Sequence, residues 1–149
     1  MITKVETVSL PEFYIAGITI RTSNQNGQSQ QDIGALWARF MGEGLIQKIA
    51  GRLSDDIYSV YTDYESDHNG AYTVVLGCRV DASHTQPPDF TCITIPPGKY
   101  EVNTVEGEMP ASIMKAWQQI WDKTTNRKYT ADFEVYGAEK GVKIYLAVH

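Results

Sequence analysis

The hexapeptide LWARFM at residues 36–41 has a counterpart later in the chain, AWQQIW at residues 116–121. In both copies the large apolar residues recur three or four positions apart, which is the spacing of one face of an amphipathic helix. A second matching pair follows the hexapeptides, YSVY at residues 58–61 and FEVY at residues 133–136. Their aromatic and β-branched residues favour strands. Because the two pairs occur in the same order, the sequence indicates that one helix-and-strand unit occurs twice.

Further strand patterns complete each unit. We expect strands at residues 2–9, 13–22, 57–63, 72–80, 90–95, 100–105, 131–138 and 142–148, with helices over residues 33–41 and 110–121. The first two strands and the last two are each expected to form a hairpin. Residues 1–82 and 89–149 then repeat the order strand–strand–helix–strand–strand across a Pro-containing linker. This predicts a single α+β domain over residues 1–149, with an antiparallel sheet and a cleft between two helices related by a pseudo-twofold axis.

The composition is that of one globular domain. The chain has 149 residues, of which 42% are hydrophobic and 21% charged, and its net charge is −5. These values suit a domain that buries its own core. No apolar run approaches the roughly 20 residues of a membrane span, and the N-terminus lacks a signal-peptide stretch, so we expect a cytoplasmic protein without a membrane partner. Lysine and arginine form no cluster, so direct nucleic-acid binding is not expected.

Metal, redox and nucleophile motifs are missing from the sequence. Cys78 and Cys92 form no C-x-x-C motif and cannot make a disulfide framework. His68, His84 and His149 fall in a loop, in a linker and at the chain end, which does not favour a shared metal. No G-x-S-x-G, H-E-x-x-H or P-loop pattern occurs. We therefore expect no catalytic residue, metal or cofactor.

Glu134 breaks the match between the two units, because its counterpart is Ser59. Side chains alternate along a strand, so Glu134 and Tyr136 share one face. If the helices cover this face, the carboxylate lies under Trp117 or Trp121 and must be paired, protonated or free to meet a ligand. A carboxylate within aromatic walls suits an organic cation. The alternatives are that Glu134 faces solvent or pairs with Lys143 on the neighbouring strand.

The sequence resembles the effector-binding domains attached to AraC-type and MerR-type transcription activators, which also occur alone as gyrase-inhibitor-like proteins. The residues that carry the resemblance are PEFYIAG at 11–17, IPPGKY at 95–100, the helix of Trp117, DFEVY at 132–136 and IYLAV at 144–148. The resemblance covers essentially the whole chain and implies a tandem α+β repeat whose central cleft binds small molecules, often lipophilic cations. Since 149 residues leave no room for a helix-turn-helix segment, it implies the sensor module of a bacterial transcription regulator. A separate DNA-binding regulator is then a candidate protein partner.

The resemblance also implies roles for individual residues. Glu134 is the expected counter-charge for an amphipathic cation bound without catalysis. The expected walls are aromatic or thioether side chains: Trp37, Tyr58, Trp117, Tyr136 and Tyr145, then Phe40, Met41 and Trp121. One alternative is a hydrolase of electrophilic small molecules, in which Glu134 activates water beside Tyr136 or Tyr145. Another is a gyrase-inhibiting interaction protein that acts through its acidic outer surface.

Overall fold

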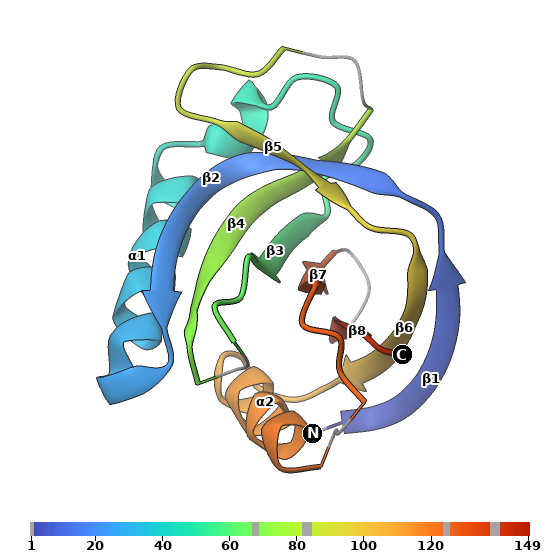
Figure 1. Ribbon diagram of the computed structural model, residues 1–149. Helices are drawn as coiled ribbons and strands as arrows, with labels where there is room; N and C mark the ends of the chain where they lie inside the picture. The colour runs from blue at the N-terminus through green and yellow to red at the C-terminus, as the bar shows by residue number, and fades with distance from the viewer. Residues whose placement is uncertain (1, 67–68, 82–84, 124–125, 138–140) are drawn as a thin grey trace.

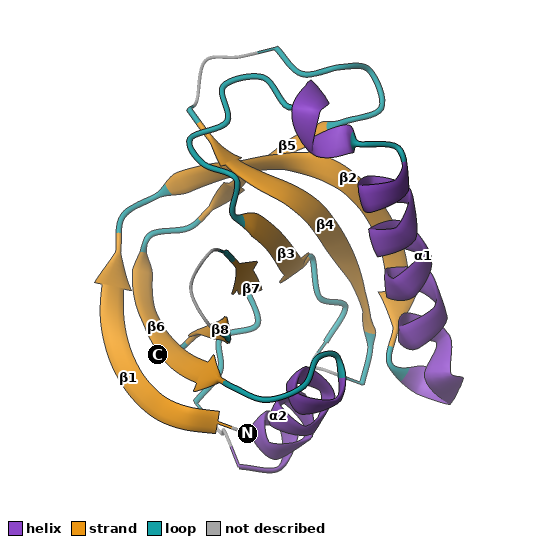
Figure 2. Ribbon diagram, turned by 180° about the vertical axis from the view of Figure 1, so that it is seen from behind, coloured by secondary structure: helices purple, strands orange, loops and turns teal. Residues whose placement is uncertain are grey.

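The computed structural model describes residues 2–66, 69–81, 85–123, 126–137 and 141–149. In these residues eight strands form a single antiparallel sheet, and two α-helices pack against one face of it (Figures 1 and 2). The strands are β1 (Ile2–Leu10), β2 (Phe13–Ser23), β3 (Ile57–Thr62), β4 (Ala71–Val80), β5 (Thr91–Ile95), β6 (Gly98–Val105), β7 (Ala131–Tyr136) and β8 (Val142–Ala147). The helices are α1 (Gln28–Gly42) and α2 (Ala111–Lys123), with the short 3-10 turns η1 (Gln25–Gly27) and η2 (Leu45–Lys48) beside α1. The expected α+β class with an antiparallel sheet is thus confirmed.

The order of the strands is symmetric about the middle of the sheet. It runs β1-β6-β8-β7-β3-β4-β2-β5, so that β1 corresponds to β5, β6 to β2, β8 to β4 and β7 to β3. The two strands that hold the matching tetrapeptides, β3 and β7, pair at the centre, where Ser59 lies opposite Glu134. This order agrees with a pseudo-twofold axis that passes between β3 and β7.

The expected hairpin of the first two strands does not form, and that expectation was wrong. β1 pairs with β6, whereas β2 pairs with β4 and β5. Figure 1 shows β2 continuing the arc of β1 instead of turning back beside it. Each unit therefore gives its first strand to the edge of the other unit. The closing hairpin of β7 and β8 is present as expected, but Ala138, the predicted end of its first strand, lies outside the described residues.

Two glycines let β2 and β4 approach each other closely. Gly17 and Gly77 face each other in the register of these strands. A Cβ at Gly17 would lie 2.0 Å from the carbonyl oxygen of Leu76, and a Cβ at Gly77 would lie 1.9 Å from that of Ala16. Both distances are far inside van der Waals contact, so this crossing requires glycine on both strands.

Three groups of buried side chains stabilise the sheet. One lies under α1 and contains Leu36 and Phe40, and another lies under α2 and contains Ile113 and Ile120. The third lies on the opposite face and is centred on Phe133. Because the two helices cover separate halves of one face, the centre of that face, at β3 and β7, lies between them. No helix in the described residues is long and apolar enough to cross a membrane.

Candidate ligand-binding cavity

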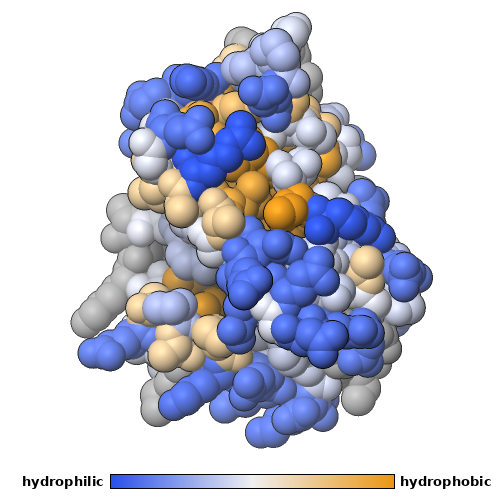
Figure 3. All heavy atoms as spheres, turned by 90° about the vertical axis from the view of Figure 1, so that its left-hand side faces the viewer, coloured by the Kyte–Doolittle hydropathy of each residue, from blue (hydrophilic) through white to orange (hydrophobic). Residues whose placement is uncertain are grey.

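A cavity of about 690 Å³ lies between α1 and α2, above β3, β4 and β7. Its volume falls in the range of small-molecule sites. Three tryptophans line it, Trp37 from α1 and Trp117 and Trp121 from α2, together with tyrosines from the strands. On the side of the molecule that carries α1, Figure 3 shows apolar residues gathered in patches that hydrophilic residues surround. The cleft between the helices that the sequence predicted is therefore present, and most of its lining is aromatic or aliphatic.

Glu134 lies on the sheet side of this cavity and is only 3% exposed. Its Oε2 atom accepts hydrogen bonds from the Tyr61 hydroxyl at 2.8 Å and from Trp117 Nε1 at 2.5 Å. Its Oε1 atom accepts one from the Tyr136 hydroxyl at 2.5 Å. These three donors come from β3, α2 and β7, so the carboxylate joins both halves of the fold. All three donors are uncharged.

Burial raises the pKa of the Glu134 carboxyl above its ordinary value, although the hydrogen bonds from Tyr136, Trp117 and Tyr61 oppose that shift. Burial, with the adjacent Glu134 charge, also raises the pKa of the Tyr61 and Tyr136 hydroxyls. Both tyrosines therefore stay protonated at neutral pH and remain hydrogen-bond donors. Among the described residues, the side chains that contact the desolvated Glu134 carboxyl by hydrogen bonds are therefore all uncharged donors.

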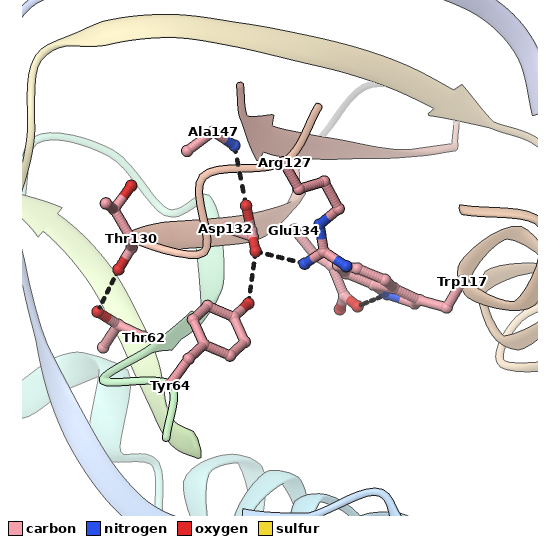
Figure 4. A network of polar contacts seen from close by, with 8 residues as sticks. All are labelled: Thr62, Tyr64, Trp117, Arg127, Thr130, Asp132, Glu134 and Ala147. Atoms are coloured by element: carbon pink, nitrogen blue, oxygen red, sulfur yellow. Dashed lines mark hydrogen bonds and ion pairs between the residues drawn. The ribbon is translucent and has the colours of Figure 1, made fainter. Parts of the chain in front are cut away.

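A second buried carboxylate, Asp132, lies two positions before Glu134 and has a charged partner (Figure 4). Its Oδ2 atom accepts hydrogen bonds from Arg127 Nη2 at 2.6 Å and from the Tyr64 hydroxyl at 2.5 Å. Its Oδ1 atom accepts one from the Ala147 amide at 2.8 Å. Arg127 thus compensates Asp132. Within the described part of the chain, no lysine, arginine or histidine forms an ion pair with Glu134.

Aromatic rings form the walls around the carboxylate. The Trp37 and Tyr136 rings meet edge-on, with their centroids 4.8 Å apart. The Trp117 and Tyr61 rings also meet edge-on, with their centroids 5.4 Å apart. Trp121 follows Trp117 on α2, with their ring centroids 6.5 Å apart. Glu134 and four expected wall residues, Trp37, Trp117, Trp121 and Tyr136, therefore meet in one place. The alternative positions for Glu134 were wrong, because it is buried and Lys143 lies opposite Val135 on the other face.

The other four expected wall residues do not line the cavity. Tyr58 and Tyr145 lie on the opposite face, where both pack against Phe133. Strand alternation is the reason, since Tyr58 precedes Ser59 and Ser59 shares the face of Glu134. Phe40 is fully buried between α1 and the sheet. Met41 is 61% exposed, because it lies one helical turn beyond Trp37 and past the cavity.

Several residues that line the cavity were not predicted from the sequence. Tyr61 carried a signal, since it is the counterpart of Tyr136 in the matching tetrapeptides. Tyr64, Tyr72 and Arg127 also line the cavity, and no repeat or motif pointed to them. Among the described residues, no three His, Cys, Asp or Glu side chains gather as metal ligands. His68 and His84 lie outside that part of the chain.

An aromatic cavity with a buried carboxylate on this α+β fold fits a protein that binds a small-molecule effector. The chain belongs to the family described as integron-associated effector binding protein, whose profile matches residues 6–148. The resemblance to effector-binding domains is thus confirmed. The family is named for binding rather than catalysis, which agrees with a protein that is not an enzyme.

Relatives of known structure or name span nearly the whole chain. The integron cassette protein VCH_CASS2 from the mobile metagenome of Vibrio cholerae is 29% identical, with a TM-score of 0.78, over 99% of this chain and 97% of that one. SAV2435, solved with tetraphenylphosphonium, is 22% identical, with a TM-score of 0.79, over 99% of this chain and 94% of that one. YobU of Bacillus subtilis (strain 168), named as a candidate transcriptional regulator, is 29% identical over 89% of this chain and 90% of its own length.

Proposed function

We propose that this protein binds an amphipathic aromatic cation in the cavity between α1 and α2, with Glu134 as the counter-charge. The observation that carries the proposal is that Glu134 is buried among uncharged donors, while the nearby cation, Arg127, already compensates Asp132. A cationic ligand supplies the missing charge. The Trp37, Trp117 and Tyr136 rings offer it stacking and cation–π contacts.

The likeness to SAV2435 supports the same class of ligand. Tetraphenylphosphonium, the compound bound to that protein, is a lipophilic cation that carries four aromatic rings and no hydrogen-bond donor. A ligand without donors suits Glu134, because its carboxylate already accepts three hydrogen bonds. YobU is named as a transcriptional regulator. This name supports a role for the cation as an effector whose binding is sensed by a DNA-binding partner protein.

Glu134→Gln tests the counter-charge. The substitution keeps the shape and an acceptor oxygen but removes the charge. We expect the affinity for tetraphenylphosphonium to fall by about tenfold or more, which corresponds to about 1.4 kcal/mol. The affinity for triphenylmethane, which is uncharged, should fall much less. Quenching of tryptophan fluorescence measures both affinities, since all three tryptophans line the cavity.

Glu108→Gln is the matched control, because it makes the same change in net charge at an exposed position. It should leave the affinity for tetraphenylphosphonium within about twofold, since exposed charges are screened by water and salt. Equal losses in the two variants, or equal losses for the charged and uncharged ligands in Glu134→Gln, would contradict the counter-charge role.

A further inference from the structure

Arg127 lies in the wall of the same cavity and presents more hydrogen-bond donors than its contacts use. The residue is 6% exposed, and within the described ranges only its Nη2 atom donates to a side chain, the Asp132 carboxylate. The guanidinium lies over the Tyr129 ring at 4.2 Å and over the Trp117 ring at 5.8 Å. Aromatic rings thus pack against the flat surface of the guanidinium, whose N–H groups point outward in its own plane.

Two guanidinium nitrogens, Nε and Nη1 of Arg127, are buried and have no hydrogen-bond partner among the described residues. A buried donor that loses its water without gaining an acceptor is unfavourable, and more so when it carries charge. Arg127 is also a lining residue of the cavity. An acceptor for these nitrogens can therefore come from a molecule in the cavity.

The charges around Arg127 define what kind of acceptor fits. Asp132 already neutralises the guanidinium, so a second carboxylate would add an unpaired negative charge to a buried site. An uncharged oxygen accepts the same hydrogen bonds without that cost. Figure 4 shows the guanidinium between the Asp132 carboxylate and the Trp117 ring, whose Nε1 donates to Glu134. The Trp117 indole thus contacts both residues, since its Nε1 atom donates to Glu134 and the Arg127 guanidinium lies 5.8 Å from its ring centroid.

We propose that Arg127 forms a second polar subsite, which binds an uncharged hydrogen-bond acceptor on the same aromatic cation whose charge lies at Glu134. This inference rests on the proposed function and narrows it to a class of ligand: aromatic cations that also carry a carbonyl, ether or sulfonyl oxygen. The cation contacts Glu134, its ring lies along Trp117, and its oxygen accepts from Arg127.

Two phosphonium cations of equal charge and nearly equal shape test the subsite. One is (4-acetylphenyl)triphenylphosphonium, and the other is (4-isopropylphenyl)triphenylphosphonium, in which a methyl group replaces the carbonyl oxygen. We expect the natural protein to bind the acetyl compound about tenfold more tightly, because the oxygen gains a hydrogen bond to a charged donor. Calorimetric titration measures both affinities. Equal affinities would overturn the subsite and leave the cation site intact, whereas binding of neither compound would overturn the proposed function.

Two variants identify the donor. Arg127→Lys keeps a positive charge for Asp132 but removes the nitrogens that lack partners, so the preference for the acetyl compound should fall below twofold. Glu134→Gln should weaken both compounds by a similar factor and keep that preference. A preference that is unchanged in Arg127→Lys would overturn the assignment to Arg127.

A crystal structure of the complex tests the subsite without any variant, in case Arg127→Lys does not fold. The acetyl oxygen should lie within 3.5 Å of Arg127 Nε or Nη1. Ordered water on both nitrogens, with the acetyl oxygen elsewhere, would overturn the proposal.

Discussion

Two buried carboxylates on one face of β7 have opposite surroundings. Asp132 accepts from a guanidinium, a hydroxyl and a backbone amide, so its charge is compensated within the protein. Glu134, two residues later, accepts from a tryptophan and two tyrosines, and these are its only side-chain donors in the part of the chain that the structure describes. The two acids are neighbours on the same strand face, yet Asp132 has a cationic partner and the described donors to Glu134 are all uncharged. The difference lies in one residue, Arg127, that reaches the first carboxylate and not the second.

The raised pKa of Glu134 predicts how affinity depends on pH. If Glu134 is the counter-charge, cation binding needs the ionised carboxylate. Affinity for tetraphenylphosphonium should then rise as pH increases through the pKa of the empty site, which lies above the ordinary 4.5, and level off beyond it. Binding should release protons on the acidic side of that range. Calorimetry in two buffers of different ionisation enthalpy measures this release.

The same shift has a defined sign for stability. Folding raises the pKa of the Glu134 carboxyl, so the protonated form favours the folded state, and the ligand-free protein loses stability as pH rises from the unfolded pKa through the folded one. A bound cation should offset that loss. Glu134→Gln is the control for the pH dependence of affinity. In this variant the affinity for tetraphenylphosphonium should not change over the same pH range. If its affinity depends on pH as strongly as that of the natural protein, the titrating group is not Glu134.

At the scale of elements, α1 carries two apolar rows with different tasks. Leu36 and Phe40 pack into the core against β2 and β4. Ile33 and Trp37 line the cavity. Residues four positions apart lie in one row, and successive residues are turned by about 100°, so the two rows are adjacent but face different neighbours. One apolar stripe in the sequence thus serves both the core and the cavity.

This division predicts separate effects for two substitutions in α1. Phe40→Ala should lower the free energy of unfolding by about 3–5 kcal/mol, because it leaves a cavity in the core. Trp37→Ala should change stability less and weaken binding of tetraphenylphosphonium by roughly fivefold or more, through lost ring contact. Urea denaturation and ligand titration well below the melting temperature measure the two quantities. A larger loss of affinity in Phe40→Ala than in Trp37→Ala would contradict the assignment of the rows.

At the scale of the whole molecule, the two halves of the chain complete each other. β1 from the first half forms the edge beside β6, and β5 from the second half forms the edge beside β2. β3 and β7 join the halves at the centre of the sheet. The cavity depends on both halves, because α1 and α2 each supply one wall and Glu134 accepts from Tyr61 of the first half.

Separate halves should therefore not fold alone. Fragments 1–82 and 83–149, each produced by itself, should lack the dispersed amide spectrum of a folded domain, since each exposes an unpaired central strand and has lost its partner's edge strand. Co-expressed, they should assemble and bind tetraphenylphosphonium. Nuclear magnetic resonance spectra and fluorescence titration report these outcomes, and a folded, ligand-binding single fragment would disprove the interdependence.

The sequence alone determined the parts of the fold that follow local periodicity. Residues spaced three or four apart predicted both helices, and alternating residues predicted the strands and put Glu134 and Tyr136 on one face. The match between Ser59 and Glu134 indicated which residue departs from the repeat. The same alternation was available for Tyr58 and would have placed it on the opposite face. Helices, strands and the faces of a strand depend on residues that are close in the sequence, so the pattern of apolar and polar side chains predicts them.

Only the tertiary structure decided which distant strands pair and which charges meet. The exchange of β1 and β5 between the halves depends on backbone hydrogen bonds, and these carry no signature of residue type. The pairing of Arg127 with Asp132, which leaves Glu134 among uncharged donors, depends on where the loop after α2 brings one guanidinium. In a buried site the energy of a charge is set by the groups within a few ångströms in space. The positions of those groups along the sequence do not reveal which of them lie close to the charge.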